Sequence, residues 1–259
     1  MKRRSWLTTS PTAAVLLPIL GLAGAIALWW LATIVFSIES YLLPSPYDVV
    51  VKFFDDPAYL LQHTATSFLE TVEGFLLAIV LGVPIALLIV RSVILERLVY
   101  PLLLMVNAIP KIAIAPLLVV WMGFGQWPKV VMVLLVCFFP IVISTAQGMK
   151  STPLELVELL RSLNASRTQE FFKLRLRYAM PQIFTGMKVA ISLAVIGSVI
   201  AEFVGATQGL GYVIQQSGAS ADTALAFAAI TLLSIMSIIL FYGLVLLEHL
   251  LVPWAQETR

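Results

Sequence analysis

The stretch SLNASRTQEFFKLRLRYAMPQ, residues 162–182, gathers four basic side chains in a chain that is otherwise strongly apolar. Of the 259 residues, 60% are hydrophobic and only 12% are charged, with a mean hydropathy of +0.99. Soluble domains carry about 25% charged residues. The composition therefore predicts an all-α membrane protein, and the stretch itself must lie in a loop outside the lipid.

Long apolar runs flank this loop on both sides. A bilayer core about 30 Å thick needs roughly 20 apolar residues of helix, and the backbone inside it must be hydrogen-bonded internally. The first run is longer than the apolar core of a signal peptide, which spans about 7 to 15 residues, so we expect it to be an uncleaved span. The sequence predicts one transmembrane domain, 1–259, with six spans at 13–36, 68–90, 101–122, 130–148, 186–206 and 224–252.

The basic residues are distributed unequally between alternate loops. With the N-terminus in the cytoplasm, only Lys52 and Lys129 fall in the outer segments, and Lys188 lies at a membrane boundary. Because Lys and Arg favour the cytoplasmic side, both termini are predicted to be cytoplasmic. The inner segments then hold Lys2, Arg3, Arg4, Arg91, Arg97, Lys150, Arg161, Arg167, Lys173, Arg175, Arg177 and Arg259.

The third predicted span contains an ammonium group between two prolines. Pro110 and Pro116 each lack a backbone donor and should loosen the helix around Lys111. A charged group inside a span is costly and commonly functional, which favours a place in a translocation pathway or interface. The alternative is that the Lys111 side chain reaches towards the headgroups. The sequence leaves these two interpretations open.

The fifth predicted span ends in a carboxylate followed by glycines. Glu202 is the only acidic residue well inside an apolar run, and Gly205, Gly209 and Gly211 should break the helix after it. A carboxylate in this position could pair with a cation, bind a substrate donor or cap backbone groups. We favour a packing or gating role over direct contact with the substrate, because Glu202 lies near the outer end of the span.

Few residues suggest reactive or metal chemistry. His63 and His249 have no second ligand at metal spacing, so both are expected to be solvated and no metal site is predicted. Cys137 lies mid-span and is expected to be a small buried residue. The chain has no G-x-x-x-x-G-K-[ST] motif, so we predict a protein that is not an enzyme and has no catalytic residues. Nor is any nucleic-acid partner expected.

The inner loop, 150–182, carries helix caps that can be read residue by residue. Thr152 is predicted to cap a first helix, with Glu155 as the reciprocal partner of a capping box. Asn164 suits the left-handed conformation that ends a helix, and Ser166 should cap a second one. Attraction to anionic lipid could explain the basic charge alone. Two caps favour a rigid docking element for a soluble partner.

The inner loop resembles the EAA loop of the membrane subunits of bacterial ABC importers. That pattern is Glu-Ala-Ala, a Gly four residues later, and then Leu-Pro. In this chain it falls on Glu158-Leu159-Leu160, Asn164 and Met180-Pro181. The Glu, the spacing and the Pro match, whereas the alanines, the Gly and the Leu are replaced.

Three further motifs extend the resemblance over nearly the whole chain. LPSP (43–46), IPKIAIAPLLVVWMGFG (109–125) and AEFVGATQGLGYVI (201–214) are similar to the nitrate, sulfonate, taurine and thiamine-precursor permease group. The resemblance implies a type I ABC importer (MetI-like) fold in a bacterial inner membrane. It also implies a translocation pathway for a small solute, for which an anion or a vitamin precursor is expected.

The same resemblance implies partners and site residues. A homodimer of this subunit would bind two ABC ATPase subunits, which hold ATP-Mg, and would receive solute from an extracytoplasmic binding protein. No cofactor is expected in this chain, which contacts membrane lipid. The ATPase-coupling role transfers to Glu158, Arg161, Asn164, Ala165 and Ser166, and a pathway or gating role is assigned to Pro110, Lys111, Pro116 and Glu202.

Two other functional classes are weighed against the importer. An ion-coupled secondary transporter would use intramembrane carboxylates and internal repeats, but only Glu202 and the boundary residues Glu70 and Glu73 qualify. An intramembrane hydrolase needs a nucleophile beside a base, and no G-x-S-x-G motif is present. Neither alternative explains the capped helix pair, so the secondary transporter stands as the second choice.

Overall fold

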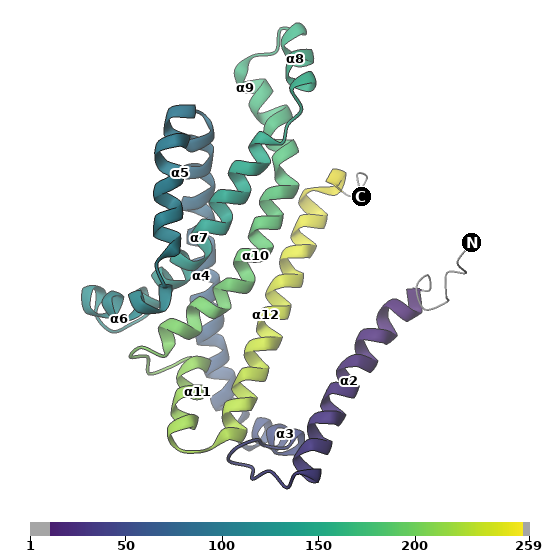
Figure 1. Ribbon diagram of the computed structural model, residues 1–259, viewed down its shortest axis with the longest axis vertical. Helices are drawn as coiled ribbons and strands as arrows, with labels where there is room; N and C mark the ends of the chain where they lie inside the picture. Colours follow the sequence, from purple (N-terminus) through teal and green to yellow (C-terminus); the bar gives the residue numbers. More distant parts are fainter. Residues whose placement is uncertain (1–10, 256–259) are drawn as a thin grey trace. The chain divides into compact units, whose positions relative to one another are not determined.

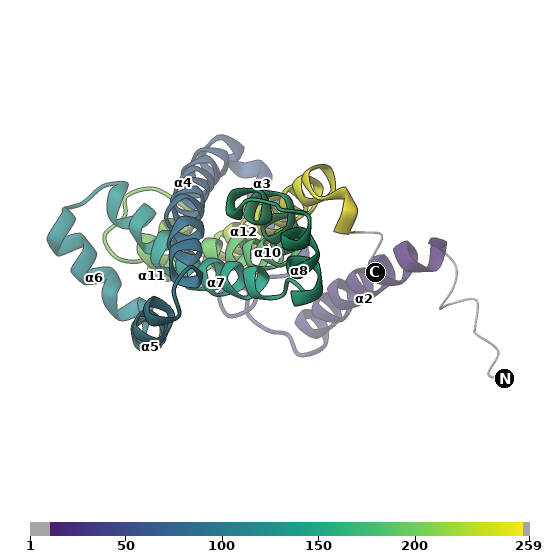
Figure 2. The same ribbon diagram turned by 90° about the horizontal axis from the view of Figure 1, so that it is seen from above.

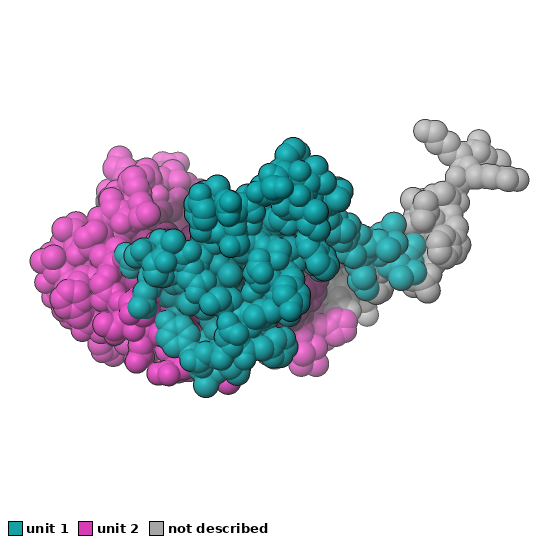
Figure 3. Space-filling view, turned by 90° about the horizontal axis from the view of Figure 1, so that it is seen from below, with its two compact units in different colours: residues 1–60, 213–230 teal, residues 61–212, 231–259 magenta. Residues whose placement is uncertain are grey.

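The computed structural model describes residues 11–255, and every regular element among them is helical (Figure 1 and Figure 2). The basic residues Lys2, Arg3, Arg4 and Arg259, which support the predicted orientation, lie outside the described residues. The chain divides into two compact units (Figure 3). Unit 1 comprises residues 1–60 and 213–230, and unit 2 comprises residues 61–212 and 231–259.

Unit 1 contains helices α2 (Pro11–Val35) and α3 (Pro46–Asp55), the end of α11 (Leu210–Ala219) and the start of α12 (Thr223–Leu251). A capping box starts α3, because the Ser45 hydroxyl accepts from the Asp48 amide while the Asp48 carboxylate accepts from the Ser45 amide. Lys52 Nζ then donates to Asp222 Oδ2 at 2.9 Å. This bond, opposed by partial burial, raises the pKa of Lys52. It fastens α3 to the start of α12.

Unit 2 holds most of the helices and the whole inner loop. The helix α10 is preceded without interruption by a π-helical turn, η1. The elements in order are α4 (Pro57–Val90), α5 (Val93–Ala108), α6 (Lys111–Met122), α7 (Trp127–Lys150), α8 (Leu154–Ser162), α9 (Arg167–Gln169), η1 (Glu170–Arg175) and α10 (Leu176–Glu202), followed by the first residues of α11, the rest of α12 and a short 3-10 turn at Pro253–Ala255.

The helices α7 and α10 lie side by side at the centre of unit 2 (Figure 1 and Figure 2). Small residues allow the close approach: a Cβ added to Gly186 would overlap Ser144, and one added to Gly197 would lie 3.1 Å from Cα of Val133. Membrane helices pack through such small residues because burial of apolar surface drives little association in lipid. Cys137 lies in this core and is fully buried, as predicted.

Within residues 11–255, five helices are long and apolar enough to cross a membrane, and the bent pair α5–α6 would make a sixth. The third predicted span, 101–122, falls on this pair and is not one loosened helix. Instead α5 and α6 meet at 90° across the Ile109-Pro110 step. Pro110 has no amide to donate and restricts Ile109 to extended conformations, whereas Pro116 lies inside α6.

Candidate functional site

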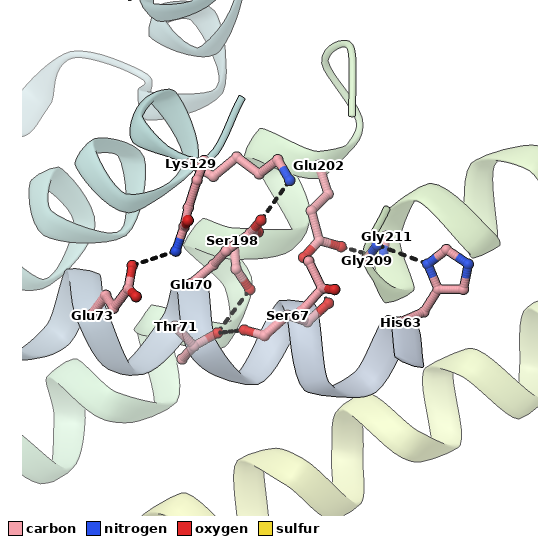
Figure 4. A network of polar contacts seen from close by, with 12 residues as sticks. His63, Ser67, Glu70, Thr71, Glu73, Lys129, Ser198, Glu202, Gly209 and Gly211 are labelled. Carbon is pink, nitrogen blue, oxygen red and sulfur yellow. Dashed lines mark hydrogen bonds and ion pairs between the residues drawn. The ribbon is translucent and has the colours of Figure 1, made fainter. Parts of the chain in front are cut away.

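A network of buried polar side chains lies where α4, α7 and α10 meet the start of α11, within unit 2 (Figure 4). Polar groups removed from water must find partners inside the protein. The side chains belong to residues that are each less than 10% exposed, namely His63, Ser67, Glu70, Thr71, Lys129, Ser198 and Glu202. They provide both acidic and basic groups and three hydroxyls that can donate as well as accept.

Glu202, the last residue of α10, binds the start of α11. Its Oε2 accepts from the Gly211 amide at 2.5 Å, and its Oε1 accepts from Ser67 Oγ at 2.6 Å. Ser67 Oγ in turn accepts from the Leu210 amide at 2.8 Å, and His63 Nδ1 accepts from the Gly209 amide at 2.9 Å. Three consecutive amides at a helix N-terminus, which lack partners within the helix, are thereby satisfied. The carboxylate also complements the positive end of the helix dipole.

The glycines after Glu202 are required by this arrangement. A Cβ on Gly209 would collide with the Glu202 carboxylate, and one on Gly211 would lie 2.8 Å from Glu202 Oε2. Gly209 also has φ +113, which L-residues with a side chain rarely adopt. The predicted helix break is confirmed, since α10 ends at Glu202 and Gly205 and Gly209 have positive φ, but Gly211 lies inside α11.

A second buried contact pairs Lys129 of α7 with Glu70 of α4. The Nζ to Oε1 distance is 2.5 Å, and Glu70 is 2% exposed. The positive charge of Lys129 offsets the cost of burying this carboxylate. Beside the pair, Thr71 Oγ1 donates to the Ser67 carbonyl at 2.6 Å and lies 3.1 Å from Ser198 Oγ. From the sequence, Lys129 was assigned to an outer segment with few basic residues. Its buried ion pair with Glu70 was not predicted.

The structure corrects the interpretation of His63. The prediction made it a solvated surface residue, yet it is 5% exposed and accepts a buried hydrogen bond. The reason is that α4 begins at Pro57, so His63 is helical and shares a face with Ser67, Glu70 and Thr71. The helical spacing of these four polar residues was the feature of the sequence that could have indicated the burial of His63. His249 is exposed, and no group of three potential ligands that could hold a metal occurs among residues 11–255.

The pathway candidates of the third span lie at the α5–α6 break, apart from the network just described. Lys111 Nζ donates to the Asn107 carbonyl at 2.5 Å and to Asn107 Oδ1 at 2.6 Å. It thereby caps the C-terminal end of α5, where a cation complements the helix dipole. Pro110 occupies the position preceding α6, and Pro116 lies six residues further on, inside α6.

The inner loop forms a helical hairpin, α8 and α9 with η1, beyond the ends of α7 and α10 (Figure 1). Its first predicted cap is wrong. Pro153, with φ −59 and ψ 137, precedes α8 itself, and no side chain caps the helix. Thr152 is buried instead, one position too early to reach the orphan amides, and its Oγ1 has no partner among the described residues.

The second cap and the turn are confirmed. Ser166 Oγ accepts from the Gln169 amide at 3.2 Å, and Gln169 Oε1 accepts from the Ser166 amide at 2.9 Å. Asn164 has φ +56, the left-handed conformation predicted for it. Of the five coupling candidates, Ala165 is half-buried, and the exposed ones are Glu158, Arg161, Asn164 and Ser166.

One hairpin residue that matters was missed by sequence reasoning. Glu170 is only 7% exposed, and its carboxylate accepts from Arg161 Nε at 3.2 Å and from Arg175 Nε at 2.8 Å. Arg161 lies in α8, whereas Glu170 and Arg175 lie in η1. The feature of the local sequence that pointed to these ion pairs was a single acidic residue, Glu170, among several basic ones.

Comparison with known proteins places these features in context. Residues 76–255 match the family described as "Binding-protein-dependent transport system inner membrane component". The chain is 37% identical to the formylaminopyrimidine transport permease protein ThiX of Halalkalibacterium halodurans, over 85% of this chain and 88% of that protein. It is 30% identical to the taurine transport system permease protein TauC of Escherichia coli, over 92% and 89%.

The fold has a counterpart among solved structures. An inward-facing structure of the MetNI methionine ABC transporter superposes with a TM-score of 0.64 at 21% identity, covering 72% of this chain and 93% of that one. The likeness establishes the helical fold.

Proposed function

The chain belongs to the family of binding-protein-dependent transport system inner membrane components, and on this premise we propose that its α8–α9 hairpin is the contact through which an ATPase subunit drives it. The chain is a multi-pass inner-membrane permease subunit of an ABC importer. In such systems ATP is hydrolysed by a separate subunit. Family membership therefore favours the importer over an ion-coupled secondary transporter.

The coupling role is supported by the rigidity and exposure of the hairpin. The Ser166 capping box and the left-handed Asn164 fix the turn, while Glu158 and Arg161 remain exposed beside it. A fixed turn with exposed charges can transmit force from a soluble partner. The hairpin also runs through η1 directly into α10, so a displacement of the turn reaches a membrane span. We assign Glu158, Arg161, Asn164, Ala165 and Ser166 to this contact.

Two ATPase subunits, each holding ATP-Mg, are proposed for an assembly that contains two copies of this permease. The α5–α6 break supports a second copy. The 16 residues of α5 span about 24 Å, so the break lies within the apolar zone. Irregular backbone does not face lipid there, yet Ile109 is 47% exposed in this subunit. We propose that a second copy and the water-filled pathway between the copies cover this face.

The pathway residues follow from that placement. Pro110 creates the break, and Lys111 holds its ammonium beside it. Pro116 lies in α6, which with 12 residues is too short to cross the bilayer alone. Glu202 is assigned to a gate rather than to solute contact, because both of its oxygens are engaged by the protein. It fastens the end of α10 to α11.

The proposed solute is small, either an anion such as a sulfonate or a vitamin precursor, and an extracytoplasmic binding protein delivers it. The named relatives transport formylaminopyrimidine and taurine. Both termini are proposed to be cytoplasmic, which places the basic hairpin on the side of the ATPase. No cofactor is proposed for this chain itself.

The decisive experiment identifies what stays bound to the subunit. A tagged chain, extracted gently from its native membrane, should retain an ATPase subunit in equal amount by quantitative mass spectrometry. Arg161→Glu should abolish that retention, whereas Arg97→Glu, the same charge reversal on α5, should not. Equal retention in both variants, with normal solute uptake, would refute the hairpin as the coupling contact.

A further inference from the structure

Glu170 stands out because it is a buried carboxylate in a hairpin whose residues are mostly exposed. The residues from Arg167 to Gln169 are exposed, whereas Glu170 is 7% exposed. Burial of a carboxylate is unfavourable unless cations and hydrogen bonds compensate for it. Glu170 has that compensation, since its two oxygens bind two different arginines.

The two arginines belong to different parts of the hairpin. Arg161 lies in the last turn of α8 and donates from Nε to Glu170 Oε2. Arg175 ends η1 and donates to Glu170 Oε1. The carboxylate therefore bridges the helix before the turn and the helical segment that continues into α10. This side-chain link adds to the backbone connection between α8 and η1, which runs through the turn at residues 163–166 and through α9.

Arg161 is held by one side only. It uses Nε to reach Glu170, while 64% of its side chain remains exposed. A guanidinium carries five donors in a fixed plane, so anchoring one edge orients the others. The donors of Arg161 that point into solvent can then form a bidentate pair with a carboxylate of another protein.

We propose that Glu170 is a positioning residue for ATP-driven transport: it aims Arg161 at an acidic side chain of the ATPase subunit and ties α8 to the base of α10. This proposal rests on the proposed coupling role of the hairpin and adds to it the chemistry of the partner surface. With this link intact, movement of the ATPase at α8 passes to the base of α10 through Glu170 as well as through the backbone of the turn.

The test compares solute transported per ATP hydrolysed in the reconstituted complex with its binding protein. Glu170→Gln keeps the size of the side chain and removes its charge. We expect transport per ATP to fall about tenfold, the effect of losing one charge-assisted hydrogen bond. Glu170→Asp should restore part of it. The control is Glu96→Gln, which breaks the Lys150–Glu96 ion pair of unit 2 outside the hairpin and should leave the ratio unchanged.

A double mutant separates positioning from simple stabilisation. If Glu170 acts through Arg161, then Glu170→Gln combined with Arg161→Ala should be no worse in transport per ATP than Arg161→Ala alone. Should Glu170→Gln fold poorly, as judged by its melting temperature, Glu170→Asp alone and Glu170→Asp combined with Arg161→Ala provide the comparison. Independent, multiplicative losses would overturn the proposal.

The two hypotheses can fail separately. If solute transported per ATP is unchanged in Glu170→Gln while ATPase retention is lost in Arg161→Glu, the positioning role of Glu170 is refuted. The coupling role of the hairpin is then retained. Full retention and normal uptake in Arg161→Glu would overturn both.

Discussion

The buried network and the α8–α9 hairpin each depend on a glutamate, and these two glutamates lie near opposite ends of one helical segment. Glu202 lies among side chains from three helices, all nearly excluded from solvent, and closes the start of α11. Glu170 is buried among residues that are mostly exposed, and one of its two arginine partners faces solvent. The first site joins helices within unit 2, whereas the second leaves the guanidinium of Arg161 exposed for the contact proposed above.

The difference in surroundings determines what a substitution should do. An unpaired charge in a buried site costs several kcal/mol, whereas an exposed ion pair contributes about 0–1 kcal/mol. Changes in the network should therefore lower stability before they alter coupling. Changes in the hairpin should alter coupling while the subunit stays folded, and five substitutions test this contrast.

The largest effect is expected for Lys129→Met. It leaves the Glu70 carboxylate buried without its cation, which should lower the free energy of unfolding by about 3–5 kcal/mol. Denaturant unfolding in detergent measures it. Combining Lys129→Met with Glu70→Gln removes both charges and should recover most of the loss. A single mutant as stable as the wild type would show that the pair contributes nothing.

Gly209→Ala should follow, with a loss of about 2–3 kcal/mol from strain at positive φ and from collision with the Glu202 carboxylate. Thermal unfolding of the purified subunit reports it. The control is Gly218→Ala in α11, where an added Cβ meets no atom within 4 Å. Equal melting temperatures for the two variants would contradict the geometry at Gly209.

Glu202→Gln retains the size of the side chain but weakens the bonds to the Gly211 amide and Ser67, at a cost of about 2 kcal/mol. Solute uptake should fall while the ATPase subunit is retained in full, because the change lies far from the hairpin. Normal uptake would return Glu202 to a purely structural role. Loss of ATPase retention would show that network and hairpin are not separable.

Asn164→Val tests the hairpin turn. A β-branched residue at φ +56 should cost about 1–2 kcal/mol locally and distort the docking surface. We expect uptake to be lost at an unchanged melting temperature of the membrane core. Asn164→Gly, which tolerates this conformation, is the matched control and should transport normally. Equal solute uptake by both variants would show that the left-handed turn at Asn164 is not needed for coupling.

The smallest effect is expected for Ser166→Ala, which removes one half of the capping box at a cost of about 1 kcal/mol. Hydrogen exchange at the Gln169 amide should accelerate. Thr152→Ala serves as the control, because Thr152 Oγ1 caps nothing and exchange in α8 should not change. Faster exchange in α8 of that control would contradict the corrected start of the helix.

Structural features could be predicted from the sequence where their physical cause acts between residues close together in the chain. Apolar run length and turn chemistry act over short stretches of the chain, so the presence of five to six apolar spans among the described residues, the Asn164 turn and the Ser166 cap were predictable. The first cap failed by one residue, because Pro153 itself occupies the position before α8. The sequence predicted one loosened helix around Pro110, whereas α5 and α6 meet there at a right angle. The prediction failed because a proline can either kink a helix or end it.

The buried pair could not be predicted in the same way. Glu70 and Lys129 are 59 residues apart and meet only when α4 packs on α7. His63 was misjudged because the start of α4 was placed too late, which hid the polar stripe shared with Ser67. Pairing across helices depends on which faces pack together, and one sequence without its tertiary context does not specify those faces.

The continuity of η1 and α10 has a mechanical consequence. Residues 167–202 form one helical segment, so Glu170 and Glu202 are about 48 Å apart along it at 1.5 Å per residue. Over that length, a tilt of about 5° pivoting at Glu202 would sweep Glu170 sideways by about 4 Å. A small change of angle at Glu202 thus corresponds to a large displacement at Glu170. A partner that moves the hairpin sideways would therefore act on the polar contacts of Glu202 as a torque, with a lever arm of about 48 Å.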